Sequence, residues 1–389
     1  MNHKLIEDLH LLNSFYKLPI VISYSKGFYV YDINKNAYLD FMCGYGVALL
    51  GHNYEIIKNA IIEQLEKIAV AHSSLYLDVR AEFLDVLFSI LPKELSRCFI
   101  TNSGSEAIEL AIKLVRKRGK KVIISMENAY HGKTLGALSL TNKEKYRRSF
   151  EPLLKEVRFA KFNDTEDLLN KIDSDTGAVI LEPIQGEAGV IIPNENYLKA
   201  VRDICDEKGI LLILDEIQTG LGRTGKLFYF EYENVVPDIL CIGKGLAGGL
   251  PVGCVITKEE LNILKTGEHT STFGGNPLVC AVAREILKYI YKQKLWENAK
   301  VVGEYFLRKL KSLNFDFKEA RGKGLMLALE FKKDIKDLIK CMLRNGLLTC
   351  FTAPNIIRFL PPLNIGYKEV DEAINKLESA LLEWTKLSH

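Results

Sequence analysis

Lys244 is the residue with the clearest potential for chemistry. It is the only charged side chain between Asp238 and Lys258, in a stretch that is mostly apolar residues and glycines. An ammonium in such surroundings costs free energy unless it finds a partner or loses its proton. A lysine whose pKa is lowered by desolvation can attack a carbonyl carbon and form a Schiff base. The alternative is an ordinary exposed lysine in a glycine-rich loop, because most lysines lie at the surface.

A carboxylate ends another apolar run. The stretch Leu-Leu-Ile-Leu at 211–214 leads directly into Asp215, and Glu216 follows. A carboxylate at the end of a buried strand needs a cation, a metal ion or a protonated ring nitrogen beside it. A structural ion pair would explain Asp215 equally well.

A third feature suits an anion. Ser103 and Glu106 have the spacing of a capping box at the start of a predicted helix. Ser103, Gly104 and Ser105 would place N–H groups and hydroxyls at the positive end of the helix dipole, which favours a phosphate. A plain helix cap accounts for the same residues.

Together these three features fit one ligand. A phosphate anchor, a carboxylate for a ring nitrogen and an amine that bonds to an aldehyde are the three handles of pyridoxal 5'-phosphate (PLP). All three features follow predicted strands of one sheet, at the edge where such folds bind ligands.

The elements that must position these residues alternate along the middle of the chain. Short apolar runs separated by helical patterns predict an α/β fold with a mostly parallel sheet covered by helices on both faces. The predicted strands are residues 121–125, 178–183, 211–215, 239–243 and 252–256, and the predicted helices are residues 106–118 and 197–208.

The pattern changes after Asn276. A long helical stretch is expected from Pro277 toward Ala299, then a basic loop leading into a strand within residues 318–331, and a short strand at 356–360. We expect this part to form a smaller α+β domain. The expected boundaries are 46–276 for a large PLP-binding domain, 277–389 for the smaller domain, and 1–45 for an N-terminal segment that joins the smaller domain through a hairpin arm at 27–32.

Composition excludes several classes of partner. The 389 residues are 48% hydrophobic and carry a net charge of only +3, which argues against nucleic acid and membrane as partners. No apolar run reaches the roughly 18 residues of a membrane span. The cysteines form no Cys-x-x-Cys pair and the histidines no His-Glu-x-x-His pattern, so no metal site is expected. Buried free thiols in a reducing cytoplasm are the expected state.

One segment imitates a nucleotide-binding loop. Residues 220–226 match Gly-x-x-x-x-Gly-Lys, but Leu227 stands where a metal-binding Ser or Thr is required. The acidic strand would also run straight into the loop, whereas a phosphate-binding loop follows its own strand. A nucleotide-binding or non-catalytic protein therefore remains only as a rival class.

Nine stretches, in order along the chain, resemble the class III aminotransferases of the ornithine and acetylornithine type. The resemblance covers nearly the whole length and implies a fold type I PLP enzyme, a homodimer whose active sites lie at the subunit interface. The stretches are TNSGSEAIELAIKLVR, AYHGKTLGALSLT, ILEPIQGEAGV, LLILDEIQTGLGRTGKL, ENVVPDIL, GKGLAGGLPVG, GEHTSTFGGNP, RGKGLMLALEF and IIRFLPPL.

The resemblance implies a role for each matching position around the cofactor. Lys244 forms the Schiff base, Asp215 pairs with the pyridine nitrogen, and Gln218 lies against the ring oxygen. Tyr130 stacks on the ring. The remaining cofactor-binding residues that it implies are Ser103, Gly104, Ser105, His131, Glu182 and, reaching the partner subunit's cofactor, Thr272.

The resemblance also implies a substrate site. Arg358 binds a carboxylate, chiefly that of 2-oxoglutarate, and Glu187 pairs with Arg358 or swings away as the two substrates alternate. Lys133, Ser271 and Tyr45 complete the expected substrate-binding set.

Two of these residues give conflicting indications of the amino donor. Tyr45 stands where ornithine aminotransferases have a tyrosine, but Lys133 replaces the family's carboxylate-clamping arginine, as in putrescine aminotransferases. A lysine cannot make the same bidentate pair. The expected reaction moves the terminal amino group of an ornithine, acetylornithine or lysine type donor to 2-oxoglutarate. Putrescine and 4-aminobutyrate are the alternative donors, and another fold type I enzyme, such as a decarboxylase, an aminomutase or a racemase, is the alternative class.

Overall fold

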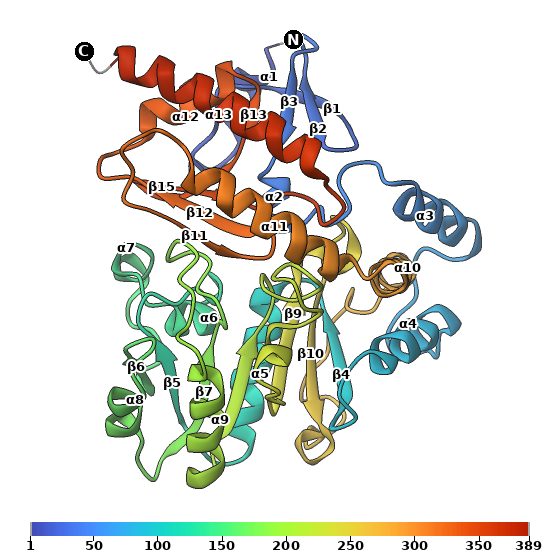
Figure 1. The fold of residues 1–389 in the computed structure, drawn as a ribbon. Helices are drawn as coiled ribbons and strands as arrows, with labels where there is room; N and C mark the ends of the chain where they lie inside the picture. The colour runs from blue at the N-terminus through green and yellow to red at the C-terminus, as the bar shows by residue number, and fades with distance from the viewer. Residues whose placement is uncertain (1, 388–389) are drawn as a thin grey trace.

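A seven-stranded sheet forms the centre of the computed structural model, which describes residues 2–387 (Figure 1). The strand order is β4-β10-β9-β8-β7-β5-β6, and only β10 runs antiparallel to its neighbours. The predicted α/β class with a mostly parallel sheet is confirmed. The strands are β4 (Leu95–Thr101), β5 (Val122–Met126), β6 (Val157–Ala160), β7 (Thr176–Leu181), β8 (Leu211–Asp215), β9 (Ile239–Gly243) and β10 (Gly253–Lys258).

Helices bury both faces of this sheet. Along β8, Leu211 and Ile213 face the apolar cluster of α5 (Gly104–Lys117), whereas Leu212 and Leu214 face the cluster that contains α9 (Tyr197–Lys208). Because both faces are covered, the strands read as continuous apolar runs rather than as an alternating pattern. The other helices between residues 55 and 171 are α3 (Glu55–Lys67), α4 (Asp78–Ser89), α6 (Leu135–Leu140), α7 (Glu144–Arg147) and α8 (Thr165–Lys171).

The long helix predicted from Pro277 toward Ala299 is two helices. Helix α10 ends at Gln293 and α11 (Leu295–Lys311) begins two residues later. Lys294 separates them with a left-handed φ of 48°. A lysine in this conformation breaks the helix without the glycine or proline that would reveal a break in the sequence.

A second sheet, in the order β11-β12-β15-β14, lies above the first one (Figure 1). The expectation of a basic loop before the strand within 318–331 is wrong, because a hairpin forms there. Arg321 lies in β11 and Lys318 directly precedes it, and both basic side chains pair with Glu330 across the hairpin at 2.6 Å. The strands are β11 (Glu319–Lys323), β12 (Met326–Glu330), β14 (Cys350–Ala353) and β15 (Ile356–Phe359).

The two ends of the chain share a third sheet. The hairpin expected at 27–32 is present, with Gly27 at a φ of 60° in its turn, and β3 pairs in parallel with β13. This sheet is flanked by the C-terminal helices at the top of Figure 1. Its strands are β1 (Ile22–Lys26), β2 (Tyr29–Asp32), β3 (Ala37–Asp40) and β13 (Leu347–Leu348), and the remaining helices are α1 (His3–His10), α2 (Cys43–Gly46), α10 (Pro277–Gln293), α12 (Lys336–Arg344) and α13 (Tyr367–Leu387).

The loop that imitates a nucleotide-binding motif has a structural role. Its Arg223 is 1% exposed and donates hydrogen bonds to the carbonyl oxygens of Leu325, at 3.0 Å, and Pro361. These bonds join the loop after β8 to the second sheet. The arginine therefore accounts for the conformation of residues 220–226 without a bound nucleotide.

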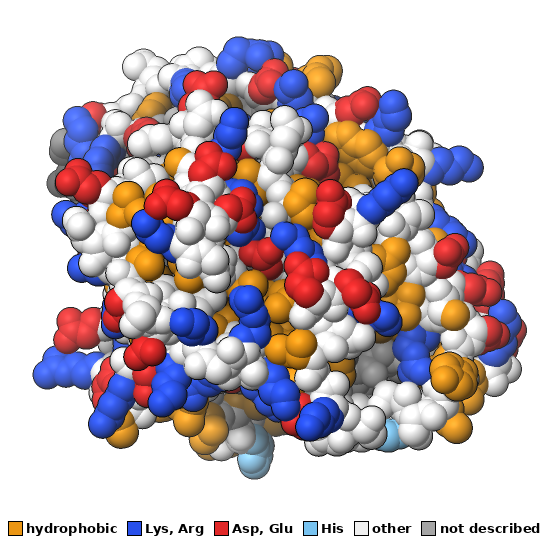
Figure 2. Space-filling model, turned by 90° about the horizontal axis from the view of Figure 1, so that it is seen from below, with side chains coloured by type: hydrophobic (Ala, Val, Ile, Leu, Met, Phe, Trp, Pro, Cys, Tyr) orange, Lys and Arg blue, Asp and Glu red, His pale blue; other side chains and the backbone are white. Residues whose placement is uncertain are grey.

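The surface carries charges of both signs. Figure 2 looks onto the lower end of the layer formed by the seven-stranded sheet, where basic and acidic side chains are interspersed. No helix within residues 2–387 is both long enough and apolar enough to cross a membrane. Seven of the eight cysteines are buried and Cys98 is half-buried, all as free thiols, in agreement with the expectation from the sequence.

Glu216 makes the stability of the fold depend on pH. Its carboxylate accepts hydrogen bonds from the N–H groups of Tyr229 and Phe230 and from the Thr219 hydroxyl, yet burial raises its pKa from 4.5 to about 7. Between these values the folded chain binds more protons than the unfolded chain, so stability is lost as the pH rises through the folded pKa. We expect the melting temperature to fall from about pH 5 to about pH 8, and to fall less in Glu216→Gln.

The matched control is Glu207→Gln, at an exposed position on α9, which should keep the full wild-type fall. Thermal melts of the three proteins across this pH range make the measurement. If the melting temperature of Glu216→Gln falls with pH as steeply as that of the wild type, the pH dependence does not come from Glu216.

Candidate active site

Five strands of the large sheet deliver side chains to one edge. The segments that follow β4, β5, β7, β8 and β9 all begin at the carboxyl ends of parallel strands, so they meet there. They enclose a cavity of about 200 Å³. Its lining residues are Ser103, Gly104, Ser105, Tyr130, His131, Gly132, Glu182, Glu187, Asp215, Ile217, Gln218 and Lys244.

The first turn of α5 forms an anion cradle at this edge. Ser103 caps the helix by accepting a hydrogen bond from the N–H of Glu106 at 3.2 Å. The Glu106 carboxylate does not close the capping box on Ser103, because it accepts instead from the N–H of Asn102 at 2.9 Å. The N–H groups of Gly104 and Ser105 belong to the first helical turn, which has no acceptors of its own, and they are free to bind a phosphate.

Two glycines allow close packing around this cradle. A Cβ at Gly132, where φ is 135°, would lie 2.2 Å from the hydroxyl oxygen of Ser105. A Cβ at Gly104 would lie 2.7 Å from Ile217 Cδ1. Side chains at these positions would displace the groups that line the cavity.

The carboxylate of Asp215 is fixed from two sides. Its Oδ2 lies 2.7 Å from Nδ1 of His131, and its Oδ1 accepts from the N–H of Ile217 at 3.1 Å. Both Asp215 and His131 are buried, and among the described residues His131 Nε2 has no partner. A buried carboxylate held in this way is set to bind a cationic group in the cavity, such as a protonated ring nitrogen.

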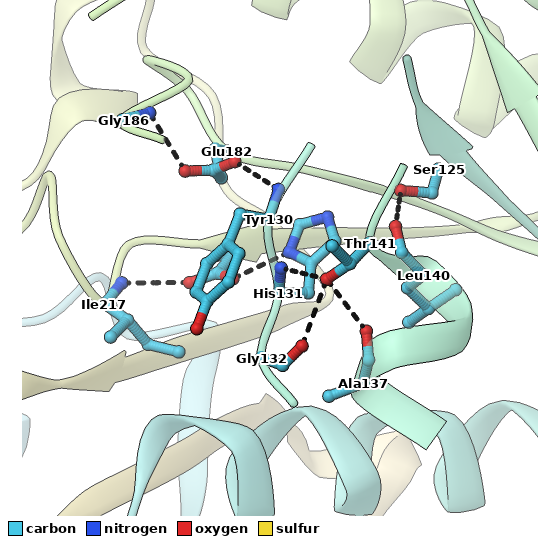
Figure 3. Close-up of polar contacts among 11 residues, drawn as sticks. Ser125, Tyr130, His131, Gly132, Ala137, Leu140, Thr141, Glu182, Gly186 and Ile217 are labelled. Carbon is cyan, nitrogen blue, oxygen red and sulfur yellow. Dashed lines mark hydrogen bonds and ion pairs between the residues drawn. The ribbon is translucent and has the colours of Figure 1, made fainter. Parts of the chain in front are cut away.

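Glu182 shapes the wall beside Asp215. It accepts hydrogen bonds from the N–H groups of Tyr130, at 2.9 Å, and Gly186, at 3.1 Å (Figure 3). Burial raises the pKa of its carboxyl from 4.5 to about 7, although the nearby His131 acts in the opposite direction. Glu182 thus fixes the backbone that carries the Tyr130 ring into the cavity.

Lys244 directly follows β9 and points its amine into the same cavity. Its backbone has a φ of 47°, an uncommon conformation for a residue with a side chain. Burial lowers the pKa of its amine, against the charges of Asp215 and Glu187. Within residues 2–387, no hydrogen bond or ion pair engages its Nζ. An unpaired lysine with a lowered pKa is suited to act as a nucleophile and a base.

Arg358 on β15 approaches the cavity from the second sheet. It is 0% exposed, and its guanidinium donates to the Glu187 carboxylate at 2.6 Å and to Gln218 Oε1 at 3.2 Å. Burial raises the pKa of the Glu187 carboxyl, but the charge and hydrogen bond of Arg358 outweigh burial and bring it below 4.5. The Tyr45 ring centre lies 5.7 Å from the guanidinium carbon. This geometry joins Glu187, Gln218, Arg358 and Tyr45 in one cluster.

The structure does not bring every expected residue into this cavity. Lys133 is exposed, with its Nζ 4.3 Å above the centre of the Tyr146 ring. Ser271 accepts a hydrogen bond from the Asn102 side chain at 3.1 Å, behind the anion cradle, and Thr272 is exposed.

The sequence did not single out four residues that the structure places at or beside the site. Gly132 and Ile217 line the cavity, whereas Lys143 contacts the backbone of Glu187 and Tyr146 lies beneath Lys133. Gly132 and Ile217 each lie next to residues that the sequence did indicate. No spacing pattern marks Lys143 or Tyr146, because their positions depend on tertiary contacts.

Comparison with known proteins identifies the family. The family model described as Aminotransferase class-III matches residues 13–381. The chain is a class III aminotransferase. It is 40% identical over 384 residues to the acetylornithine aminotransferase of Clostridium acetobutylicum, covering 96% of this chain and 99% of the relative. It is 43% identical over 360 residues to the LysW-aminoadipate semialdehyde/glutamate semialdehyde transaminase of Sulfolobus acidocaldarius, covering 91% and 93%.

Solved structures agree with this assignment. The ornithine aminotransferase of Toxoplasma gondii superimposes with a TM-score of 0.94 at 33% identity, covering 99% of this chain and 95% of that one. The cofactor of this class III aminotransferase is PLP. The residues of the cavity fit it, since the anion cradle suits its phosphate, Asp215 its ring nitrogen, and Lys244 its aldehyde.

The close contact at Gly132 predicts a defect in cofactor binding. In Gly132→Ala the new methyl group must displace Ser105, so we expect the affinity of the aminotransferase for PLP to fall by roughly tenfold or more. Titration of the cofactor-free protein with PLP measures this affinity.

Gly119→Ala is the matched control. Gly119 also has a positive φ, of 83°, so an alanine there meets similar backbone strain. No atom lies within 4 Å of the position that its Cβ would take, so this variant displaces no neighbouring group. Equal loss of PLP affinity in the two variants would show that Gly132 contributes only through its backbone.

Proposed function

We propose that this aminotransferase moves the terminal amino group of a basic amino acid or its derivative, of the ornithine, acetylornithine or lysine type, to 2-oxoglutarate. The observation that carries the proposal is the Arg358–Glu187 pair in one cluster with Lys244 and Asp215. An arginine that is covered by a movable carboxylate can serve two substrates that differ in charge. The names of the relatives support this class of donor, because those names specify acetylornithine, ornithine and semialdehydes as the compounds that the relatives act on.

PLP, when bound, supplies an aldehyde that bonds to amines and a ring that stabilises the electron pair left when a C–H proton is removed. The residues of this chain position and move that proton. Lys244, with its lowered pKa, is the base that takes the proton from the substrate carbon bearing the amino group. It returns the proton to the carbon on the other side of that nitrogen. Asp215, oriented by His131, keeps the ring nitrogen protonated and so favours proton removal.

Glu187 and Arg358 account for the use of two substrates in turn. While Glu187 neutralises Arg358, the pocket accepts a donor whose reacting end is an amine. When Glu187 moves away, the exposed guanidinium can bind a carboxylate of 2-oxoglutarate through paired hydrogen bonds.

Lys133 bears on the choice of donor. Its ammonium lies outside the enclosed cavity and offers a single point charge rather than the planar fork of arginine. A weaker clamp for a carboxylate favours diamines such as putrescine, which carry no carboxylate, as the second candidate donors. 4-Aminobutyrate, which does carry one, stays an alternative donor that Lys133 does not favour. We nevertheless favour the amino acid donor because Tyr45 lies beside Arg358 in the same cluster.

We further propose a homodimer with shared active sites, located in the cytoplasm. Apolar side chains are exposed at the end of α3, just after it and beside Thr272, and exposed apolar patches of this kind mark protein interfaces. They include Leu65, Ile68, Val70, Leu75, Tyr76 and Phe273. Thr272 does not line the cavity of its own chain, as expected for a residue that reaches the cofactor of the partner. The residues that line the cavity all fall within the proposed domain 46–276, and Arg358 approaches it from the proposed domain 277–389. The buried free thiols suit a reducing compartment.

A panel of donors with 2-oxoglutarate tests the reaction, with glutamate formation as the measurement. Glutamate formed from ornithine, acetylornithine or a lysine derivative supports the proposal. Conversion of the donor without glutamate would favour a decarboxylase, an aminomutase or a racemase instead.

Substitution of the two central residues should have distinct effects. Lys244→Ala is expected to abolish turnover and the absorbance of the lysine-linked cofactor, which borohydride reduction would otherwise fix to the chain. Asp215→Asn should retain phosphate anchoring but lose roughly 10²- to 10⁴-fold in turnover, because the ring nitrogen loses its anionic partner. Asp203→Asn, at an exposed position on α9, is the control. Near-normal turnover in Asp215→Asn would remove its assigned role.

Lys133→Arg should shift the donor preference. The planar guanidinium can pair with a carboxylate through two hydrogen bonds, so kcat/KM for ornithine relative to putrescine is expected to rise about tenfold. Lys145→Arg, on α7, makes the same chemical change at an exposed neighbouring position. An unchanged ratio in Lys133→Arg would show that Lys133 does not face the substrate.

A further inference from the structure

Lys143 is a cation beside the active site that the reaction described above does not use. It precedes α7, and its Nζ donates a hydrogen bond to the backbone carbonyl oxygen of Glu187. It is half-buried, and burial lowers the pKa of its ammonium while the charge of Glu187 raises it. Lys143 is therefore bound to the same residue whose carboxylate covers Arg358.

The movement of Glu187 poses an electrostatic problem. The Glu187 side chain is only 17% exposed while it pairs with Arg358. When a dicarboxylate takes its place, the displaced carboxylate must leave a fully buried cation. An unpaired, poorly solvated carboxylate is unfavourable in such a place, which would oppose binding of the acceptor.

Lys143 lies where it can offset this cost. Its ammonium is bound to the carbonyl oxygen of Glu187, and its charge lowers the pKa of the Glu187 carboxyl, so the carboxylate lies within electrostatic range of the same ammonium. We propose that Lys143 is the second partner of Glu187, which receives its carboxylate when the acceptor occupies Arg358, and that it thereby determines the affinity for the dicarboxylate acceptor.

This role makes Lys143 a positioning residue, because it acts through Glu187 and not on the substrate. It rests on the proposed exchange between an amino donor and 2-oxoglutarate. Its consequence is an asymmetry between the two halves of the reaction. The donor half proceeds while Glu187 pairs with Arg358 and does not need Lys143. The acceptor half needs Lys143 as the second partner of the Glu187 carboxylate.

The test separates the two half-reactions by following the cofactor absorbance in single turnovers. In Lys143→Met we expect KM for 2-oxoglutarate to rise roughly tenfold, the size of one hydrogen-bonded ion pair, and the donor half-reaction to stay within about twofold. Lys143→Arg keeps the cation and should restore most of the acceptor affinity. Lys145→Met, an exposed neighbour on α7, should leave both halves unchanged.

A double-substitution cycle with Glu187→Gln adds a readout that a purely structural role would not move. A neutral side chain at 187 needs no cationic partner, so Lys143→Met should have less than about a twofold effect in that background. Partial misfolding of Lys143→Met would lower both half-reactions equally and could not imitate the split.

The outcomes distinguish this inference from the proposed function. If the wild type forms no glutamate with any donor, both fail. If the wild type is active but Lys143→Met slows both halves equally, or the two substitutions have additive effects on acceptor KM, only the role of Lys143 is overturned.

Discussion

The common direction of six strands is the constraint on which the site depends. Because β4, β9, β8, β7 and β5 end at the same edge, a helix cap, an aromatic ring and the ionisable groups of Glu182, Asp215 and Lys244 converge without any long loop. The single antiparallel strand, β10, begins at this edge. Its Gly253 passes so close to the helix cap that a Cβ would lie 2.3 Å from the carbonyl oxygen of Ser103. Strand β10 thus lies packed between β4, which leads into the anion cradle, and β9, which leads into Lys244.

In the cavity, burial and the neighbouring opposite charges shift the pKa values of Lys244 and Glu187 in opposite directions. Asp215 and Glu187 raise the pKa of Lys244, whereas burial lowers it, and burial has the larger effect. For Glu187 the balance is reversed, because the direct contact with Arg358 outweighs burial. Burial thus opposes the charged form at both residues, and it prevails at Lys244 but not at Glu187. The difference lies in whether a counter-charge is in hydrogen-bonding contact.

Local chemistry explains how much of this could be predicted from the sequence. The buried strands, the helix cap and the positions of Asp215 and Lys244 are visible because apolar runs and their flanking residues encode them locally. The break at Lys294 and the hairpin around Gly324 were missed, since a lysine in a left-handed conformation and a basic strand paired with Glu330 carry no distinctive pattern. The pairing of His131 with Asp215 joins residues 84 positions apart, so no spacing reveals it. The role of each expected site residue in binding and catalysis stays a prediction.

Arg223 has a consequence that reaches beyond the loop it stabilises. It joins the loop after β8, which carries Gln218, to the backbone at Leu325, in the turn before β12, and at Pro361, just after β15, the strand that carries Arg358. The bonds from this buried guanidinium to the main chain hold the loop that carries Gln218 against the sheet that carries Arg358. If Arg358 holds one end of the substrate as proposed, that fixed separation makes the fit depend on the length of the carbon chain as well as on its charge.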